Sequence, residues 1–216
     1  MAEERLDRAA QEALVRLTWS ALEAAVQHTQ GPTRQDIAHA LKTHPGLAEP
    51  RGAFVTVYVA GQLRGCLGEI EPEIPLAEVV ERCARRAPRH DTRFDPVRPD
   101  ELTRLSFNIS VLSPNEPVGT LEQIEIGRHG LLVRHAGHLG LLLPEVPVEH
   151  GWDGTTFLRH LWQKAGLDAN VPVDAVQLWR FSTQLIESHE FPTIPRPGHA
   201  AQAERTGGPG RAEDIC

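Results

Sequence analysis

One short stretch of the sequence, QLRGCLGEI at residues 62–70, brings together residue types that could do chemistry. It places Cys66 two positions after Arg64, and both lie among glycines. A cysteine sulfur is a nucleophile as the thiolate, and a nearby cation favours that form. The opposite interpretation is a small apolar side chain in a strand, because cysteine outside disulfides is among the most buried residue types. The spacing leaves both interpretations open.

A strand over residues 62–68 would separate this stretch into two faces, because successive side chains point to opposite sides. The two sets are Leu63, Gly65 and Leu67 on one face and Arg64, Cys66 and Gly68 on the other. The leucine face suits a hydrophobic core, and the second face would carry the arginine beside the thiol. Since Gly68 has no side chain, we expect room next to the sulfur for another backbone or a ligand.

The segment HDTRFDP at residues 90–96 displays a second group of functional side chains in a tight turn that ends at proline. It offers His90, Asp91 and Arg93, and it follows a helix that carries a row of arginines. Loops often present functional groups, so a site for a carboxylate or phosphate is one interpretation. The other is a solvated surface with local pairing, because nine acidic residues between positions 64 and 104 offset eight arginines.

Three histidines invite the interpretation of a metal site. His135 and His138 flank the expected two-residue turn of a hairpin and would face each other across it, with His129 close by in the sequence. No carboxylate or cysteine follows at a spacing that would complete a zinc site. We therefore predict no metal site, and solvated turn histidines are the simpler interpretation.

The segment EHGWD at residues 149–153 precedes an expected helix. Glu149 and His150 could supply an acid and a base. Alternatively, the segment caps the helix through Asp153 and packs Trp152 against it. The pattern does not decide between these two roles.

Composition narrows the class of protein. The chain has 216 residues, of which 40% are hydrophobic, enough for one large domain or a domain with a small satellite. It contains no apolar run near the ~20 residues of a membrane span, and its charged beginning does not resemble a signal peptide. Three cysteines form no disulfide framework, which favours the cytoplasm. A net charge of −7 makes nucleic acid an unfavourable partner.

The apolar periodicity predicts the elements that must position these groups. We expect helices over residues 4–30, 33–44, 75–87 and 153–165, and strands or hairpins over 53–60, 62–68, 104–112, 131–143 and 176–186. Hairpins mixed with helices indicate an α+β fold with a mainly antiparallel sheet flanked by helices. Residues 1–191 would form the folded part, with a larger and a smaller subdomain. Residues 192–216, rich in proline, glycine and charge, are expected to be disordered.

Four stretches in this order resemble the AMMECR domain, which in prokaryotes is protein A of the AmmeMemoRadiSam system. The stretches are GAFVTVYVAGQLRGCLG, HDTRFDPV, LSFNISVLSPNEPV and GLLLPEVPVEHGWDGTTFLRHLWQKAGL, and the resemblance covers about residues 5–190. It implies a two-part fold and two companions, a Memo-like protein and a radical S-adenosylmethionine enzyme. It also implies that Leu63–Gly68 is the functional site. Thr92 and His150 depart from the family pattern, which commonly has proline and tyrosine there.

Two hypotheses follow. In the first, the protein is an enzyme or enzyme subunit that uses Cys66 as nucleophile or attachment point, assisted by Arg64, with His90 or His150 as a base. In the second, it is a non-catalytic module that presents the same stretch to a protein or a small molecule, and Cys66 is structural. The resemblance implies no particular reaction or cofactor. The candidate ligand-binding residues are Gly65, Gly68, Glu69, Asp91, Arg93, Glu149 and Trp152.

Overall fold

The computed structural model describes residues 5–195, which form two compact units. The larger unit contains Leu6–Ile109 and the chain from Ile186, and the smaller unit contains Ser110–Leu185. Strands β3 (Leu105–Leu112) and β8 (Thr183–Glu187) carry the chain from one unit to the other. The predicted combination of helices with antiparallel pairing is therefore confirmed, with two four-stranded sheets where one main sheet was expected.

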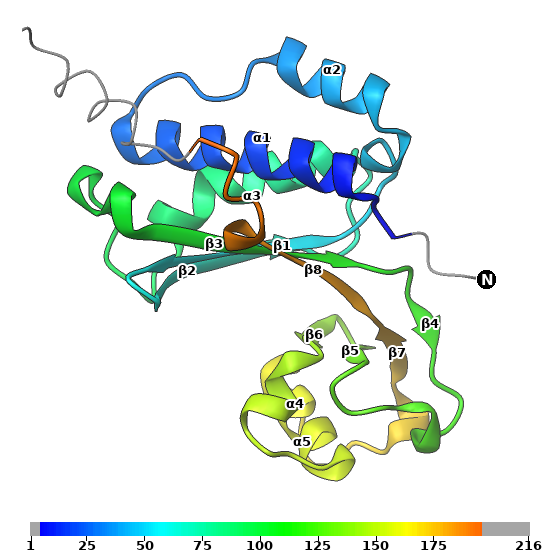
Figure 1. Ribbon diagram of the computed structural model, residues 1–216. Coiled ribbons are helices and arrows are strands. Elements are labelled where there is room, and N and C mark those ends of the chain that lie inside the picture. The colour runs from blue at the N-terminus through cyan, green and yellow to red at the C-terminus, as the bar shows by residue number, and fades with distance from the viewer. Residues whose placement is uncertain (1–4, 196–216) are drawn as a thin grey trace, which may run out of the picture. The chain divides into compact units, whose positions relative to one another are not determined.

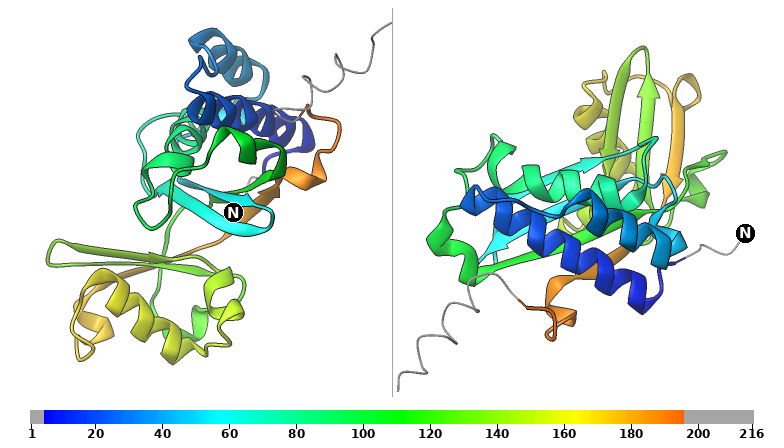
Figure 2. Two further views of the ribbon diagram at one scale, coloured as in Figure 1. Left: turned by 90° about the vertical axis from the view of Figure 1, so that its left-hand side faces the viewer. Right: turned by 90° about the horizontal axis from the view of Figure 1, so that it is seen from above.

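The larger unit places three helices on one side of a sheet (Figures 1 and 2). The sheet has the strand order β2-β1-β3-β8, with β1 at Ala53–Val59 and β2 at Gln62–Glu69. Helices α1 (Arg8–Gln27) and α3 (Leu76–His90) pack against each other, and α3 lies on β1 and β2. Helix α2 (Arg34–Thr43) packs on both. Strand β2 is thus an edge strand whose inner face is covered by α3.

Local signals explain where these helices begin and what they bury. Asp7 caps α1 by accepting a hydrogen bond from the Ala10 amide at 2.8 Å, and the predicted capping box of Thr33 and Asp36 opens α2. Helix α3 buries the face predicted for it. It also continues three residues beyond Ala87, through Pro88, and ends at His90. The buried face of α3 includes Cys83, as its helical position predicted.

The smaller unit has its own sheet and core. The sheet order is β4-β7-β5-β6, with β4 at Glu116–Pro117, β5 at Gly130–His135, β6 at His138–Leu142 and β7 at Gln177–Phe181. Helix α5 (Gly154–Ala165) packs its apolar side on β5 and β6, and the short α4 (Glu145–Glu149) precedes it. The predicted strand 176–186 is wrong as a single element. It divides at Ser182, whose amide and carbonyl bond to Ser113 while the residues before it pair with β5.

Short 3₁₀ helices complete the described chain at Pro45–Leu47, Pro99–Arg104, Leu121–Gln123, Val173–Ala175 and Ser188–Glu190. Both predicted hairpin turns form, at Ala60–Gly61 and Ala136–Gly137, with positive φ at all four residues. No helix within residues 5–195 is long and apolar enough to cross a membrane. Of the segment predicted to be disordered, residues 192–195 are described, and Ile194 is buried. Residues 196–216, including Cys216, lie outside the described part.

Candidate functional site

A β-bulge in the β1–β2 hairpin changes the expected alternation around Arg64. Val57 pairs with Gly65, but the next residue, Tyr58, pairs with Leu63, so Arg64 is the extra residue on β2. A bulge redirects side chains, and bulges are common beside functional sites. Here it turns Leu63 away from the core, and Leu63 is 40% exposed. The prediction that both leucines anchor this strand in the core is therefore wrong for Leu63.

Gly65 and Gly68 each make room for a specific neighbour. A Cβ atom on Gly65 would lie 2.1 Å from the carbonyl oxygen of Ala87, so this glycine lets β2 approach the backbone of α3. A Cβ atom on Gly68 would lie 2.3 Å from the ring of Phe54, its partner across the hairpin. The expectation of open space beside Gly68 is therefore wrong, because the Phe54 ring already fills it.

The backbone of Cys66 is held from outside the sheet by the turn that follows α3. The Cys66 amide donates to Asp91 Oδ2 at 2.9 Å, and Arg93 Nη2 donates to the Cys66 carbonyl at 3.4 Å. Arg93 Nε and Nη2 also donate to the two carboxylate oxygens of Asp91, at 2.8 and 2.6 Å. The Asp91–Arg93 pair thus supplies, at this one residue, the donor and acceptor that a neighbouring strand would provide.

Asp91 is ionised in this arrangement. Its side chain is 5% exposed, and burial alone would raise the pKa of a carboxyl group. The hydrogen bonds from Arg93, with that from the Cys66 amide, outweigh the burial and hold the pKa of Asp91 well below its usual range. The same pairing raises the pKa of Arg93, to which the nearby Cys66 also contributes. The Asp91–Arg93 pair that holds the edge of β2 is therefore an ion pair at neutral pH.

Cys66 is half-buried, and its sulfur is not in a disulfide. Its cross-strand partner is Thr56, whose hydroxyl donates to Cys66 Sγ at 3.3 Å. A hydroxyl that donates to sulfur stabilises the thiolate relative to the thiol. The Thr56 hydroxyl is thus aimed at the sulfur, and the Arg93 guanidinium lies at the Cys66 carbonyl, paired with the Asp91 carboxylate.

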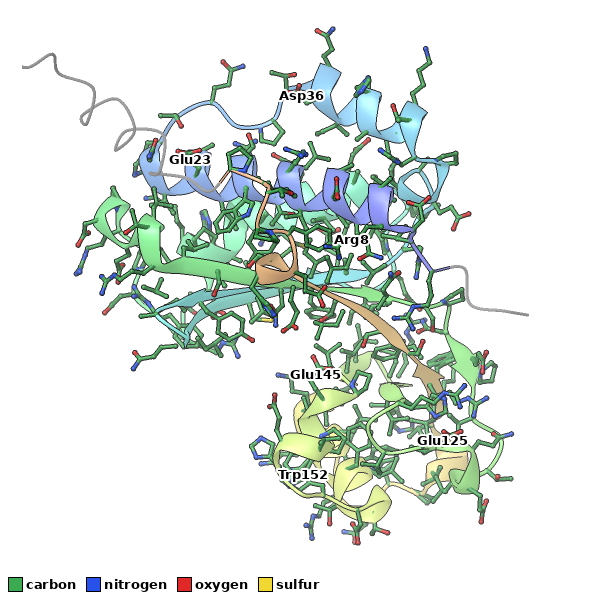
Figure 3. The ribbon with its side chains drawn as sticks, viewed as in Figure 1. Arg8, Glu23, Asp36, Glu125, Glu145 and Trp152 are labelled. Atoms are coloured by element: carbon green, nitrogen blue, oxygen red, sulfur yellow. The ribbon has the colours of Figure 1, made fainter. Side chains whose placement is uncertain are left out.

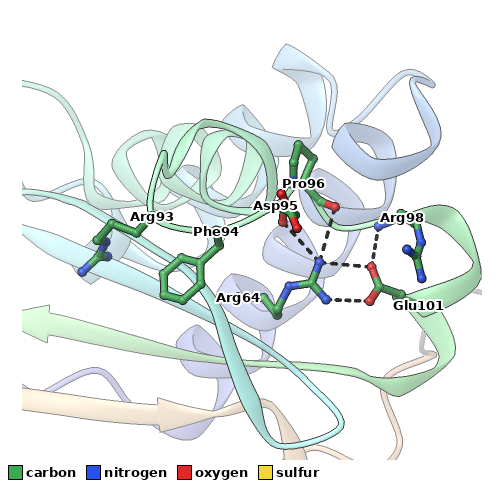
Figure 4. A pocket seen from close by; sticks show the side chains of 7 residues that line it. All are labelled: Arg64, Arg93, Phe94, Asp95, Pro96, Arg98 and Glu101. Atoms are coloured by element: carbon green, nitrogen blue, oxygen red, sulfur yellow. Dashed lines mark hydrogen bonds and ion pairs between the residues drawn. The ribbon is translucent and has the colours of Figure 1, made fainter.

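Arg64 is engaged by a different partner. Its guanidinium binds the carboxylate of Glu101 with Nη1···Oε1 at 2.6 Å and Nη2···Oε2 at 3.3 Å, and Nη2 also donates to the carbonyls of Asp95 and Pro96 (Figure 4). Glu101 is buried, and the Arg64 hydrogen bonds lower its pKa to about 2. Sequence reasoning missed Glu101. Its position could have been recognised as part of a helix cap, because Glu101 lies three residues after Arg98. The Arg98 amide donates to Glu101 Oε2 at 2.8 Å at the start of the 3₁₀ helix.

A pocket of about 690 Å³ lies where the turn after α3 wraps around the edge of β2. Its walls are Arg64, Arg93, Phe94, Asp95, Pro96, Arg98 and Glu101 (Figure 4). The volume falls in the range of small-molecule sites, roughly 300–1,000 Å³. Two of the predicted site residues, Arg64 and Arg93, border this pocket.

The other predicted residues of the larger unit lie around this centre. His90 is exposed and ends α3, directly before Asp91. Glu69 ends β2, where its Oε1 forms an ion pair with Arg82 Nε at 3.0 Å. The structure thus gathers one group at the edge of β2, from Arg64, Cys66, Asp91 and Arg93, with His90 and Glu69 at its margins.

Glu149 and Trp152 belong to the smaller unit, and Figure 3 labels Trp152 there. Trp152 stacks with His160 at a centroid distance of 3.8 Å and with His150 at 4.8 Å. Asp153 accepts a hydrogen bond from the Thr156 amide at 2.8 Å and caps α5. The predicted cap and packed tryptophan are both present, so this segment has a clear structural role.

The histidines considered for a metal bond to backbone instead. His135 Nδ1 lies 3.0 Å from the Ala175 carbonyl and His138 Nδ1 lies 3.0 Å from that of Ala165, so each ring is held by a different segment. His129 Nδ1 accepts from the Glu125 amide at 3.0 Å. Within residues 5–195, no three His, Cys, Asp or Glu side chains gather as they would around a metal ion.

Comparisons of the sequence and of the structure with known proteins agree on the proteins to which this chain is similar. A profile of the AMMECR1 family matches residues 15–186. The protein MJ0810 of Methanocaldococcus jannaschii is 42% identical over 66% of this chain and 75% of its own. A protein of Thermococcus gammatolerans is 40% identical over 85% and 92%. The crystal structure of the uncharacterised protein PH0010 from Pyrococcus horikoshii has a TM-score of 0.72 at 32% identity, over 83% of this chain and 92% of that one.

Proposed function

The chain belongs to the AMMECR1 family, and from this premise we propose that the edge of β2 around Cys66 is its working site. The protein would act with a Memo-like protein and a radical S-adenosylmethionine enzyme in a shared modification pathway, the partnership implied by the resemblance to AmmeMemoRadiSam proteins. In this pathway Cys66 serves as the nucleophile or the point of covalent attachment. The proposal concerns the larger unit alone.

One observation carries the proposal: the main chain of Cys66 is fixed on both sides while the residue is only half-buried. The Asp91–Arg93 pair holds the amide and the carbonyl, and the Thr56 hydroxyl donates to the sulfur. A cysteine that only fills a core needs neither an ion pair bonded to its amide and carbonyl nor a hydroxyl that donates to its sulfur. Cys83 provides the contrast, because burial raises its pKa to about 12 and leaves it a neutral thiol.

Alkylation with iodoacetamide, followed peptide by peptide with mass spectrometry, tests the state of the Cys66 sulfur. In this reaction the thiolate displaces iodide, so the rate reports the thiolate fraction. We expect Cys66 to react at neutral pH faster than an ordinary thiol of pKa ~8.5. Cys83 should stay unmodified in the folded protein. Thr56→Val should slow the reaction of Cys66 and Thr56→Ser should not, because serine keeps the hydroxyl. A Cys66 that resists alkylation in the folded protein, or reacts equally in both variants, contradicts the proposal.

A second candidate function is a binding module in which Cys66 is structural. It is favoured by the way Arg64 is engaged: both of its Nη atoms donate to Glu101, and Nη2 also donates to the carbonyls of Asp95 and Pro96, so the guanidinium forms part of the pocket wall. A mixture reconstituted with the Memo-like protein and the radical enzyme separates the two. Loss of product formation with Cys66→Ser supports catalysis, whereas full activity supports binding. Untargeted mass spectrometry of cells with and without the protein would identify the product.

A further inference from the structure

We propose that the pocket beside β2 binds a small molecule that carries one carboxylate group next to an apolar body. This deepens the proposed function, because it assigns a class of ligand to the same edge of β2. Phe94, Asp95 and Arg98, which lie outside the LRGCLG motif, form much of the pocket wall. Some hydrogen-bond donors of the pocket wall are engaged by neighbouring carboxylates, and others remain available to a ligand.

Two arginines of the pocket wall have donors to spare. Arg93 is held by Asp91 through Nε and Nη2, and Arg98 is held by Asp100 through Nε at 3.3 Å. Over the described range 5–195, neither Arg93 Nη1 nor either Nη atom of Arg98 donates to any acceptor. Both side chains are largely exposed, at 58% and 69%. Each guanidinium is thus oriented by an aspartate while its remaining donors are available, and guanidinium donors match a carboxylate well.

The apolar part of the wall lies in the same turn. Phe94 is half-buried, and the Arg93 guanidinium lies 5.4 Å from the centre of its ring. Pro96 adds a second apolar surface. Figure 4 shows Phe94 and Arg93 on one side of the Arg64 side chain and Glu101 on the other. A ligand that places a ring or alkyl group on Phe94 would have guanidinium donors within the same pocket.

The acidic residues of the wall limit how much negative charge the ligand can carry. Three arginines line the pocket together with Asp95 and Glu101, and each arginine is already paired with an acidic residue: Arg64 with Glu101, Arg93 with Asp91 and Arg98 with Asp100. Glu101 is neutralised by Arg64. Among residues 5–195 the Asp95 carboxylate forms no ion pair within 4 Å, although its charge acts on the nearby Arg98, and it would repel a second negative charge on the ligand. The lining therefore favours a monocarboxylate over a phosphate ester or a polyphosphate.

Two-dimensional NMR titration of the full chain tests this assignment, with benzoate as the probe. We expect saturable shifts of the Phe94 and Arg98 amides, weaker binding of phenyl phosphate, and weaker binding still of neutral benzyl alcohol. Arg98→Ala should lower the affinity for benzoate by about tenfold, as the loss of a charged hydrogen bond does. Asp95→Asn should raise the affinity for phenyl phosphate by about threefold. Arg86→Ala is the matched control, because Arg86 is exposed on α3 and outside the pocket.

Several results would overturn the assignment. These are an absence of benzoate binding in the millimolar range, equal binding of benzyl alcohol, or equal losses in Arg98→Ala and Arg86→Ala. Binding of only an acidic protein segment, with no small carboxylate, would also contradict it. The outcome is separable from the role of the thiol, because Cys66→Ser should bind benzoate as well as the wild type. A reactive Cys66 in a protein that binds no benzoate would refute the ligand assignment alone.

Discussion

Replacing Gly65 with alanine should damage the larger unit more than any other single methyl group added to the LRGCLG stretch. The added Cβ would lie 2.1 Å from the Ala87 carbonyl oxygen and 3.0 Å from its carbonyl carbon, both backbone atoms of α3. An ordinary carbon–oxygen contact is more than 1 Å longer than the first distance. Because a backbone cannot move aside as a side chain can, β2 and α3 must separate.

The expected cost follows from that displacement. Adding a methyl group to a well-packed interior costs about 1–3 kcal/mol, and a clash with helix backbone belongs at the upper end. We therefore expect Gly65→Ala to lower the free energy of unfolding by about 3 kcal/mol, a large share of the ~5–15 kcal/mol of a typical domain. The separation would also pull Cys66 away from Asp91, since Gly65 directly precedes it.

Urea denaturation, followed by tryptophan fluorescence, measures this change. Gly154→Ala is the matched control, because a Cβ atom there meets no atom within 4 Å. It should stay within about 0.5 kcal/mol of the wild type. Gly68→Ala should fall between the two, because its obstacle is the half-buried ring of Phe54, which can rotate. If Gly65→Ala is as stable as Gly154→Ala, the close approach of β2 to α3 is refuted.

Two further predictions concern the ion pairs around Cys66. Asp91→Ala should speed hydrogen exchange of the Cys66 amide by about tenfold or more, because a charged hydrogen bond to that amide is lost. The exposed Asp100→Ala is the control. Equal exchange of the Cys66 amide in the two variants would show that Asp91 does not hold this amide. For Glu101, Arg64 lowers the folded pKa from 4.5 to about 2, so the ionised group contributes stability above pH 4.5 and loses it as the pH falls toward 2. Urea titrations should therefore show that the stability difference between the wild type and Glu101→Gln is constant from pH 7 to 5 and shrinks below it. A difference that stays unchanged at pH 3 would show that Arg64 does not stabilise the ionised form.

The two glycines of LRGCLG acquire a structural explanation that the motif alone does not supply. Gly65 admits the backbone of α3, and Gly68 admits the ring of Phe54. Both positions therefore serve the packing of β2. The chemistry proposed for this edge would rest on the residues between and around them, above all Cys66 and the Asp91–Arg93 pair.

Much of the local structure was predictable. The capping box at Thr33, the cap at Asp153 and the burial of Cys83 follow from short-range patterns, because helices are specified by neighbours three and four residues apart. Both tight hairpin turns were also recognisable, at Ala60–Gly61 and at Ala136–Gly137. The family resemblance, too, was visible in the sequence motifs.

The arrangement of the site came from contacts between segments far apart in the chain. Cys66 meets Asp91 across 25 positions and Arg64 meets Glu101 across 37, and no periodicity within either segment encodes such a meeting. The bulge at Arg64 likewise depends on how β2 pairs with β1, which strand alternation cannot reveal. Residue types and spacing were thus enough to single out Cys66, Arg64, Asp91 and Arg93. Which of them would pair could be learned only from the folded chain, because hydrogen-bond partners are selected by packing in three dimensions.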